Sequence, residues 1–260
     1  EYFRILRGFG QCGSITAMPK NGQKTTMDAM VSQLERWRTD LLLETKVEAI
    51  ACIGGKVEGV VAAGPDGERL EIEAPVVISD AGPKETVKLA GESVFDKGFL
   101  DEVGDLCPTR AAVTIFGYDQ PLLDYESHVQ FIETDRLGTA WEPTHIWPDY
   151  APPGRHALYT YSTLKTEDTK KELSIIVEQC KSQFPGLEKA EIVATLVFEK
   201  DWPVLRARPG RCMGMKTPLR GLYLAGDAVN VSGWTCGEGI SFSCRAIAQD
   251  IQARFPKGKE

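Results

Sequence analysis

A short apolar segment that ends in Gly-Asp is the feature that most constrains the fold of this chain. Residues 222–225 (Leu-Tyr-Leu-Ala) predict a strand, and Gly226-Asp227 ends it abruptly. After a loop at 229–236, Gly237-Glu-Gly239 begins a predicted amphipathic helix, whose apolar residues share one face: Ile240, Cys244, Ile247 and Ile251. A strand, a tight corner and a glycine-rich helix start together predict an α/β arrangement.

The same segment suits a bound cofactor. Glycines let the backbone approach a ligand closely, and a helix N-terminus offers unpaired N–H donors with partial positive charge. The carboxylate of Asp227, at the strand end, can accept hydrogen bonds from sugar or ribityl hydroxyls. Many α/β proteins carry such a segment without a ligand, so the pattern alone does not identify one.

The letters of this region, GLYLAGDAV at 221–229 and GWTCGEGI at 233–240, carry a family resemblance. They resemble the C-terminal FAD motif of the phytoene desaturase and flavin amine oxidase superfamily. The resemblance implies that Gly226 and Asp227 lie near the ribityl–pyrophosphate part of FAD, and that Gly237, Gly239 and Ile240 face the flavin ring. It places Trp234 beside the substrate, although a packing role is equally open. The pattern departs from the family at 241–245, where Phe242 and Cys244 replace smaller residues.

A second resemblance covers residues 45–83. A Thr-x-Val start, a Gly54-Gly55 hairpin turn and a Val-Val-Ile-Ser-Asp-Ala-Gly-Pro finish are similar to the three-stranded meander of the same FAD-binding domains. The resemblance implies that Val47 contacts the adenine through its backbone, while a plain strand role for Val47 stays open. The apolar run 76–78 predicts a strand that is buried on both faces.

The middle of the chain predicts an antiparallel sheet with one long helix. The expected strands are 109–118, 129–134, 140–147, 156–163 and 191–198, and residues 166–184 predict the helix. The sheet would offer a pocket wall, although most of its aromatic residues are expected in the core: Phe116, Phe131, Trp141, Trp147, Tyr159 and Tyr161. Residues 25–40 predict a further helix that packs into the core through Met27, Met30 and Trp37.

These segments predict an α/β (α+β) fold with two domains. Residues 1–91 and 204–260 would be the remainder of an FAD-binding, Rossmann-like domain, and 92–203 a substrate domain with a mixed, mostly antiparallel sheet. Such flavoproteins begin with a strand–Gly-x-Gly-x-x-Gly–helix unit. The letters Gly8 to Gly13 match that spacing, but no convincing strand precedes them and Pro19 and Gly22 interrupt any following helix.

The chain is therefore expected to be the C-terminal part of a longer flavoenzyme whose start, since residue 1 is Glu, has been removed. Without the missing unit, the strand at 76–78 would lose neighbours in its parallel sheet. An exposed strand edge invites pairing with another chain. We expect a homodimer or a partner chain at this edge.

Composition narrows the function classes. The net charge of −7 argues against a nucleic-acid partner, and no apolar run is long enough for a transmembrane helix, which leaves peripheral membrane contact open. Seven separate cysteines favour a reducing, cytoplasmic location, and three histidines without metal spacing argue against a metal site.

The leading hypothesis is an FAD-dependent, phytoene dehydrogenase-like oxidoreductase that transfers hydride between a hydrophobic substrate carbon and the flavin. The chain alone is expected to be inactive, and no catalytic residue can be named. Two alternatives remain: a non-catalytic binding module, or one half of a split flavoenzyme that needs a partner chain.

Overall fold

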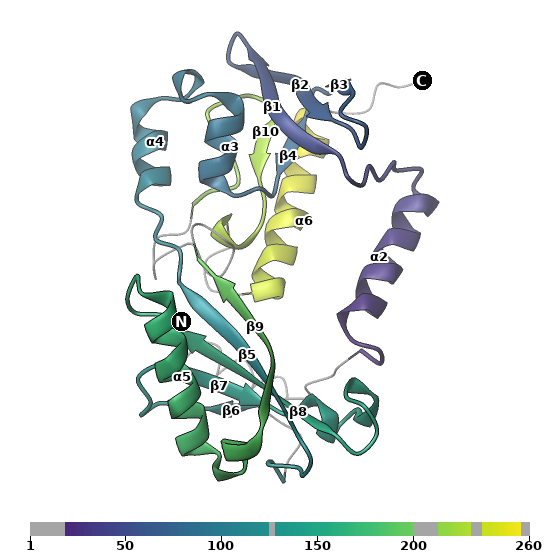
Figure 1. The fold of residues 1–260 in the computed structure, drawn as a ribbon. Coiled ribbons are helices and arrows are strands. Elements are labelled where there is room, and N and C mark those ends of the chain that lie inside the picture. Colours follow the sequence, from purple (N-terminus) through teal and green to yellow (C-terminus); the bar gives the residue numbers. More distant parts are fainter. Residues whose placement is uncertain (1–18, 125–127, 200–212, 230–235, 256–260) are drawn as a thin grey trace. The chain divides into compact units, whose positions relative to one another are not determined.

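The computed structural model describes residues 19–124, 128–199, 213–229 and 236–255, and they form two compact units. Unit 1 holds the described residues of 40–108 and 213–255, and unit 2 holds those of 19–39 and 109–199. Both units are mixtures of helices and strands (Figure 1). Most strand pairs are antiparallel, and one small sheet is parallel, so the predicted mixed α/β class is confirmed.

Unit 1 begins with a three-stranded antiparallel meander. Its strands are β1 (Lys46–Ile53), β2 (Lys56–Ala63) and β3 (Arg69–Glu73). Gly54 and Gly55 form the β1–β2 turn with φ values of 58° and 77°. This left-handed backbone suits the right-handed twist of a hairpin, and glycine adopts it at little cost.

A parallel pair of strands lies at the centre of unit 1. Strand β4 (Val77–Ser79) pairs with β10 (Leu222–Leu224), in the register Val77 to Leu222. Because side chains alternate along a strand, Leu222 and Leu224 pack in one hydrophobic cluster with helices α3 (Pro83–Ala90) and α4 (Lys97–Gly104). Tyr223 and Ala225 pack on the other face, with Ile247 of helix α6 (Cys236–Arg254).

Strand β4 differs from its prediction. Val76–Ile78 was expected to be buried on both faces, yet the Ile78 side chain is 51% exposed. Ile78 stands opposite Tyr223 in the register and borders a hollow of about 280 Å³ beside Ile247 and Ile251 of α6. Among the described residues β4 has one strand neighbour only, so the apolar run is half covered.

Unit 2 contains a five-stranded antiparallel sheet in the order β6-β7-β8-β5-β9. The strands are β5 (Ala111–Tyr118), β6 (Val129–Gln130), β7 (Leu137–Trp141), β8 (His156–Thr163) and β9 (Glu191–Phe198). Helix α5 (Thr169–Gln183) covers one face, and its Ile176 packs with the fully buried Phe116 and Leu158. The strand predicted at 140–147 is wrong beyond Trp141, because Pro143 begins a short 3₁₀ turn, Pro143–His145.

A buried ion pair fastens α5 to the β7 side of the sheet. The Glu172 carboxylate is fully buried and accepts hydrogen bonds from Arg136 Nε at 2.7 Å and from the Lys165 N–H at 3.0 Å. Thr166 Oγ1 donates a further hydrogen bond to it at 2.9 Å. The hydrogen bond from Arg136, followed by the other donors, lowers the pKa of Glu172 to about 2.

Helix α2 (Gln23–Arg36) corrects a further expectation. The helix forms where the periodicity predicts it, but none of its residues is buried. Met27, Met30 and the following Trp37 are 57%, 58% and 77% exposed, so their predicted role in the core is wrong. Periodicity predicts an apolar face; it does not say what covers that face.

Candidate functional site

The carboxyl ends of β4 and β10 form a tight corner in unit 1. The Ala225 N–H donates to Ser79 O at 2.9 Å, which extends the pairing to the last residues of both strands. Gly226 then turns with φ at 98°, and a Cβ at this residue would lie 2.2 Å from Asp80 Oδ1. Asp80 and Asp227 therefore follow the ends of two adjacent parallel strands, the place where open α/β sheets bind ligands.

The first turn of α6 lies next to this corner. Asp227 begins a short 3₁₀ turn, Asp227–Val229, in which the Val229 N–H donates to Gly226 O at 3.2 Å. The buried Ser243 hydroxyl lies 2.6 Å from Val229 O and 2.9 Å from Gly239 O. This contact holds the start of α6 beside the turn, and the start of a helix presents unpaired backbone N–H groups.

The far end of α6 is fixed to β10 by a carboxylate. Asp250 accepts a hydrogen bond from Tyr223 Oη at 2.7 Å, and Lys216 Nζ and Arg254 Nε lie 2.6 Å and 2.9 Å from its oxygens. The hydrogen bond from Lys216, followed by that from Tyr223, lowers the pKa of Asp250. Both ends of α6 are thus tied to the strand whose end forms the corner.

The structure brings part of the predicted site together. Gly226 and Asp227 form the corner, and Gly239 is linked to it through Ser243. Gly237 is exposed, and a Cβ there would meet no atom of the described residues within 4 Å. Ile240 is half-buried in the same turn.

One further predicted residue, Val47, belongs to a different sheet from this group. Val47 lies in β1, in the meander, with 38% of its surface exposed, and its pairing partner is Ala62 of β2. Trp234 lies outside the described residues, so its predicted place beside a substrate stays a prediction.

Asp80 is a site residue that the sequence reasoning missed. Its strand end, Ser79-Asp80-Ala81-Gly82, precedes α3 just as Gly226-Asp227 precedes α6. Ser79 and Thr86 of α3 share a hydrogen bond of 2.7 Å between their hydroxyls, and Gly82 has φ at 90°. The sequence signal for Asp80 was a second strand end that is followed by an aspartate, a glycine and a helix.

The sheet of unit 2 has one face that carries several aromatic side chains. On the side of the sheet opposite α5, neighbouring strands place Trp141, Tyr159 and Ile115 in one row of the register. The ring of His128 stacks on Trp141 at 4.9 Å, and burial lowers the pKa of His128, which favours the neutral ring. Tyr161 follows in the next row and is 40% exposed.

Five of the six aromatic residues named from the sequence divide between two places, and the sixth, Trp147, precedes the 3₁₀ turn Pro148–Tyr150. Phe116 and Phe131 belong to the hydrophobic cluster beneath α5, and the other four do not, so the expectation that most of the six lie in the core is wrong. Trp141, Tyr159 and Tyr161 lie on the opposite face, where the pKa of Tyr161 is raised by burial and then by Tyr159. We call this second group, with His128, the aromatic face of unit 2.

The described residues contain neither a candidate transmembrane helix nor a candidate metal site. None of the helices there is both long and apolar enough to cross a lipid bilayer. Within the same residues, no three His, Cys, Asp or Glu side chains gather in a way that could hold a metal ion.

Comparison with known proteins gives related sequences and folds. No family model matches the chain. An uncharacterized protein of Methanocaldococcus jannaschii is 25% identical over 183 residues, which cover 70% of this chain and 44% of that protein. The crystal structure of an oxidoreductase from Methanosarcina mazei is 26% identical, with a TM-score of 0.84, and the match covers 95% of this chain and 58% of that one.

More distant matches share the fold alone. Putrescine oxidase, in a structure of a variant with redesigned cofactor binding, matches with a TM-score of 0.63 at 13% identity over 90% of this chain and 53% of that one. The chain therefore matches part of the fold of FAD-dependent oxidoreductases, which confirms the predicted resemblance. It spans 44% to 58% of the length of these relatives.

Proposed function

We propose that this chain is part of an FAD-dependent oxidoreductase and that the corner at Gly226-Asp227 is its share of the cofactor site. The observation that carries this proposal is the close approach of the two strand ends beside the start of α6. Gly226 has a left-handed φ and a crowded Cβ position, and both favour glycine. Its backbone and the start of α6 are features that an extended phosphate-containing cofactor requires.

The residues of the corner fit the parts of FAD in chemical terms. Asp227 is half-buried and can accept hydrogen bonds from ribityl hydroxyls. The first turn of α6, with Gly237 and Gly239, would direct N–H donors and the positive end of the helix dipole at a group that gains negative charge. Val47 would support the adenine through its backbone. FAD, when bound, supplies the hydride chemistry; the protein supplies position and excludes water.

The proposed reaction is hydride transfer between a carbon of a hydrophobic substrate and the flavin, as in phytoene dehydrogenase-like enzymes. The composition of the aromatic face of unit 2 supports the proposal that the substrate is apolar. Its two central rows carry Trp141, Tyr159, Ile115, Ala194 and then Thr139, Tyr161, Val113, Leu196, with no charged side chain among them. A face of this composition can bind an extended hydrocarbon but offers no ion pair to a charged substrate.

We also propose that β4 is completed by a further parallel strand, from a partner chain or a second copy. Purely parallel sheets are normally covered on both faces and contain more than two strands. The exposed Ile78 and the apolar hollow beside Ile247 and Ile251 mark the place where such an element would pack. Ile78→Lys should prevent this packing without disturbing the pairing of β4 with β10.

Flavin retention tests the proposal. The purified chain is mixed with FAD, alone and with the part of the Methanosarcina mazei oxidoreductase that this chain does not cover, and is then freed of unbound FAD. We expect retained flavin absorbance in the second mixture, its loss in Asp227→Ala, and no change in Asp66→Ala, an exposed residue in the β2–β3 turn. Absence of flavin from both mixtures, or equal retention by Asp227→Ala, would refute it.

A further inference from the structure

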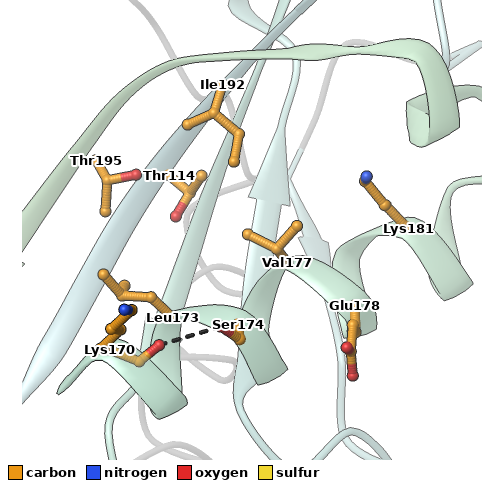
Figure 2. Close-up of a pocket in the computed structure, with 9 residues that line it drawn as sticks. All are labelled: Thr114, Lys170, Leu173, Ser174, Val177, Glu178, Lys181, Ile192 and Thr195. Atoms are coloured by element: carbon orange, nitrogen blue, oxygen red, sulfur yellow. Dashed lines mark hydrogen bonds between the residues drawn. The ribbon is translucent and has the colours of Figure 1, made fainter. Parts of the chain in front are cut away.

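A second hollow lies in unit 2, on the α5 side of the sheet and opposite the aromatic face. It has a volume of about 530 Å³, within the usual range for small-molecule sites, and it lies between α5 and strands β5 and β9 (Figure 2). Its apolar surface comes from Leu173 and Val177, one turn apart on α5, and from Ile192 on β9. We call it the α5–β9 hollow.

A buried hydroxyl without a partner points into this hollow. Thr114 of β5 is 1% exposed, and its Oγ1 has no hydrogen-bond partner among the described residues. Figure 2 shows this oxygen directed from β5 toward α5. Thr195 of β9 stands opposite Thr114 in the register and places a second hydroxyl beside it. Native proteins rarely leave a buried hydroxyl unpaired, so Thr114 points to a missing ligand atom.

Positive charge lies at the same end of the hollow. Lys170, at the start of α5, lines the hollow near Leu173, and it forms no ion pair with any described residue. Lys181 and Glu178 line the opposite end, and their formal charges sum to zero. An anion is therefore favoured beside Lys170 and the two threonines, and an apolar group beside Val177 and Ile192.

We propose that the α5–β9 hollow binds a medium-chain carboxylate. Its carboxylate would accept hydrogen bonds from the Lys170 ammonium and the hydroxyls of Thr114 and Thr195, and its chain would lie on Leu173, Val177 and Ile192. Lys170 and Lys181 are eleven positions apart on α5, a rise of about 16 Å, which leaves room for a chain of roughly eight carbons. The site does not depend on the proposed flavin function, because it lies within unit 2 alone.

Calorimetric titration of the 260-residue chain with octanoate tests the proposal, with octylammonium as the probe of opposite charge. We expect saturable binding of octanoate with one site and much weaker binding of octylammonium. Lys170→Gln and Thr114→Val should each weaken octanoate binding about tenfold, the effect of losing a hydrogen bond to a charged group. Lys171→Gln, a neighbouring exposed lysine that does not line the hollow, is the matched control.

A thermal melt separates binding from folding. Thr114→Val removes a hydroxyl that has no partner, so the melting temperature without ligand should stay the same or rise. Octanoate should raise the melting temperature of the unmodified chain and of Lys171→Gln more than that of Thr114→Val. The proposal is overturned if octanoate shows no saturable binding, if octylammonium binds equally well, or if Lys170→Gln and Lys171→Gln bind octanoate alike.

Discussion

Three glycine-to-alanine substitutions in unit 1 would show how far the strand-end corner depends on close backbone contact. Gly67, Gly226 and Gly221 all have a positive φ, at 77°, 98° and 86°. An alanine Cβ at Gly67 would meet nothing within 4 Å, at Gly226 it would lie 2.2 Å from the Asp80 side chain, and at Gly221 it would lie 2.4 Å from the backbone oxygen of Pro75. The series therefore separates backbone strain from side-chain and backbone clashes.

The expected losses of unfolding free energy follow from these contacts. Gly67→Ala carries only the strain of a left-handed backbone, about 1–2 kcal/mol. Gly226→Ala adds the rotation of the Asp80 side chain away from its position, for a total of about 2–3 kcal/mol. Gly221→Ala meets a carbonyl that cannot rotate and threatens the hydrogen bond from the Val77 N–H to Gly221 O, at 2.9 Å. We expect a loss of about 3–5 kcal/mol for this variant.

Urea unfolding of the three variants measures the series. All three residues belong to unit 1, so the same unfolding transition reports each of them. We expect the destabilisation to increase from Gly67→Ala through Gly226→Ala to Gly221→Ala. The slope of the unfolding free energy against urea concentration should stay unchanged. If Gly221→Ala proved no less stable than Gly67→Ala, β10 would not approach β4 as closely as the structure shows. The proposed corner would then lose its basis.

Three further predictions concern other parts of the fold. The folded pKa of Glu172 is about 2, against 4.5 for a free side chain, so its ion pair stabilises unit 2 above pH 4.5, and this contribution is lost as the pH falls toward 2. Glu172→Gln should flatten that part of the stability profile measured by urea unfolding. Phe116→Ala removes a fully buried ring and should destabilise unit 2 by about 3–5 kcal/mol in the same assay. Tyr223→Phe removes a hydrogen bond to the Asp250 carboxylate and should lower the unfolding free energy of unit 1 by about 1.5–3 kcal/mol.

Local patterns predicted the elements well. The periodicities at 156–163 and 191–198 match β8 and β9 residue for residue, and the Gly54-Gly55 pair predicted the hairpin turn. These signals are local: alternation of side chains and a positive φ at glycine depend on few neighbours. The strand expected at 140–147 failed for a local reason as well, since Pro143 cannot donate to a sheet ladder.

The candidate site was only partly readable from the sequence. Gly226, Asp227 and the start of α6 are contiguous in the chain, so their letters reveal them together. Asp80 lies far from them in sequence and meets them only because β4 pairs in parallel with β10. The role of Thr114 could not be predicted from the sequence. A hydroxyl is left unpaired only when no neighbouring strand or helix supplies a hydrogen-bond partner.

Burial was the weakest inference, and it failed at two apolar segments in the same way. Met27, Met30 and Trp37 of the α2 region, and Ile78 of β4, have the sequence pattern of core residues and are exposed. Soluble proteins seldom leave such side chains uncovered in groups. The chain spans only 58% of the Methanosarcina mazei oxidoreductase that it matches over 95% of its own length. We therefore propose that additional polypeptide covers these segments, and that their apolar periodicity marks the covered surface.

Lysine substitutions at Met30 and Ile78 should leave the stability of the chain alone nearly unchanged, because both side chains are already in water. The same substitutions should weaken any complex with the proposed covering polypeptide, as measured by co-purification. If the substitutions destabilised the isolated chain as much as they weakened the complex, both side chains would be buried in the isolated chain and the exposed faces would not exist.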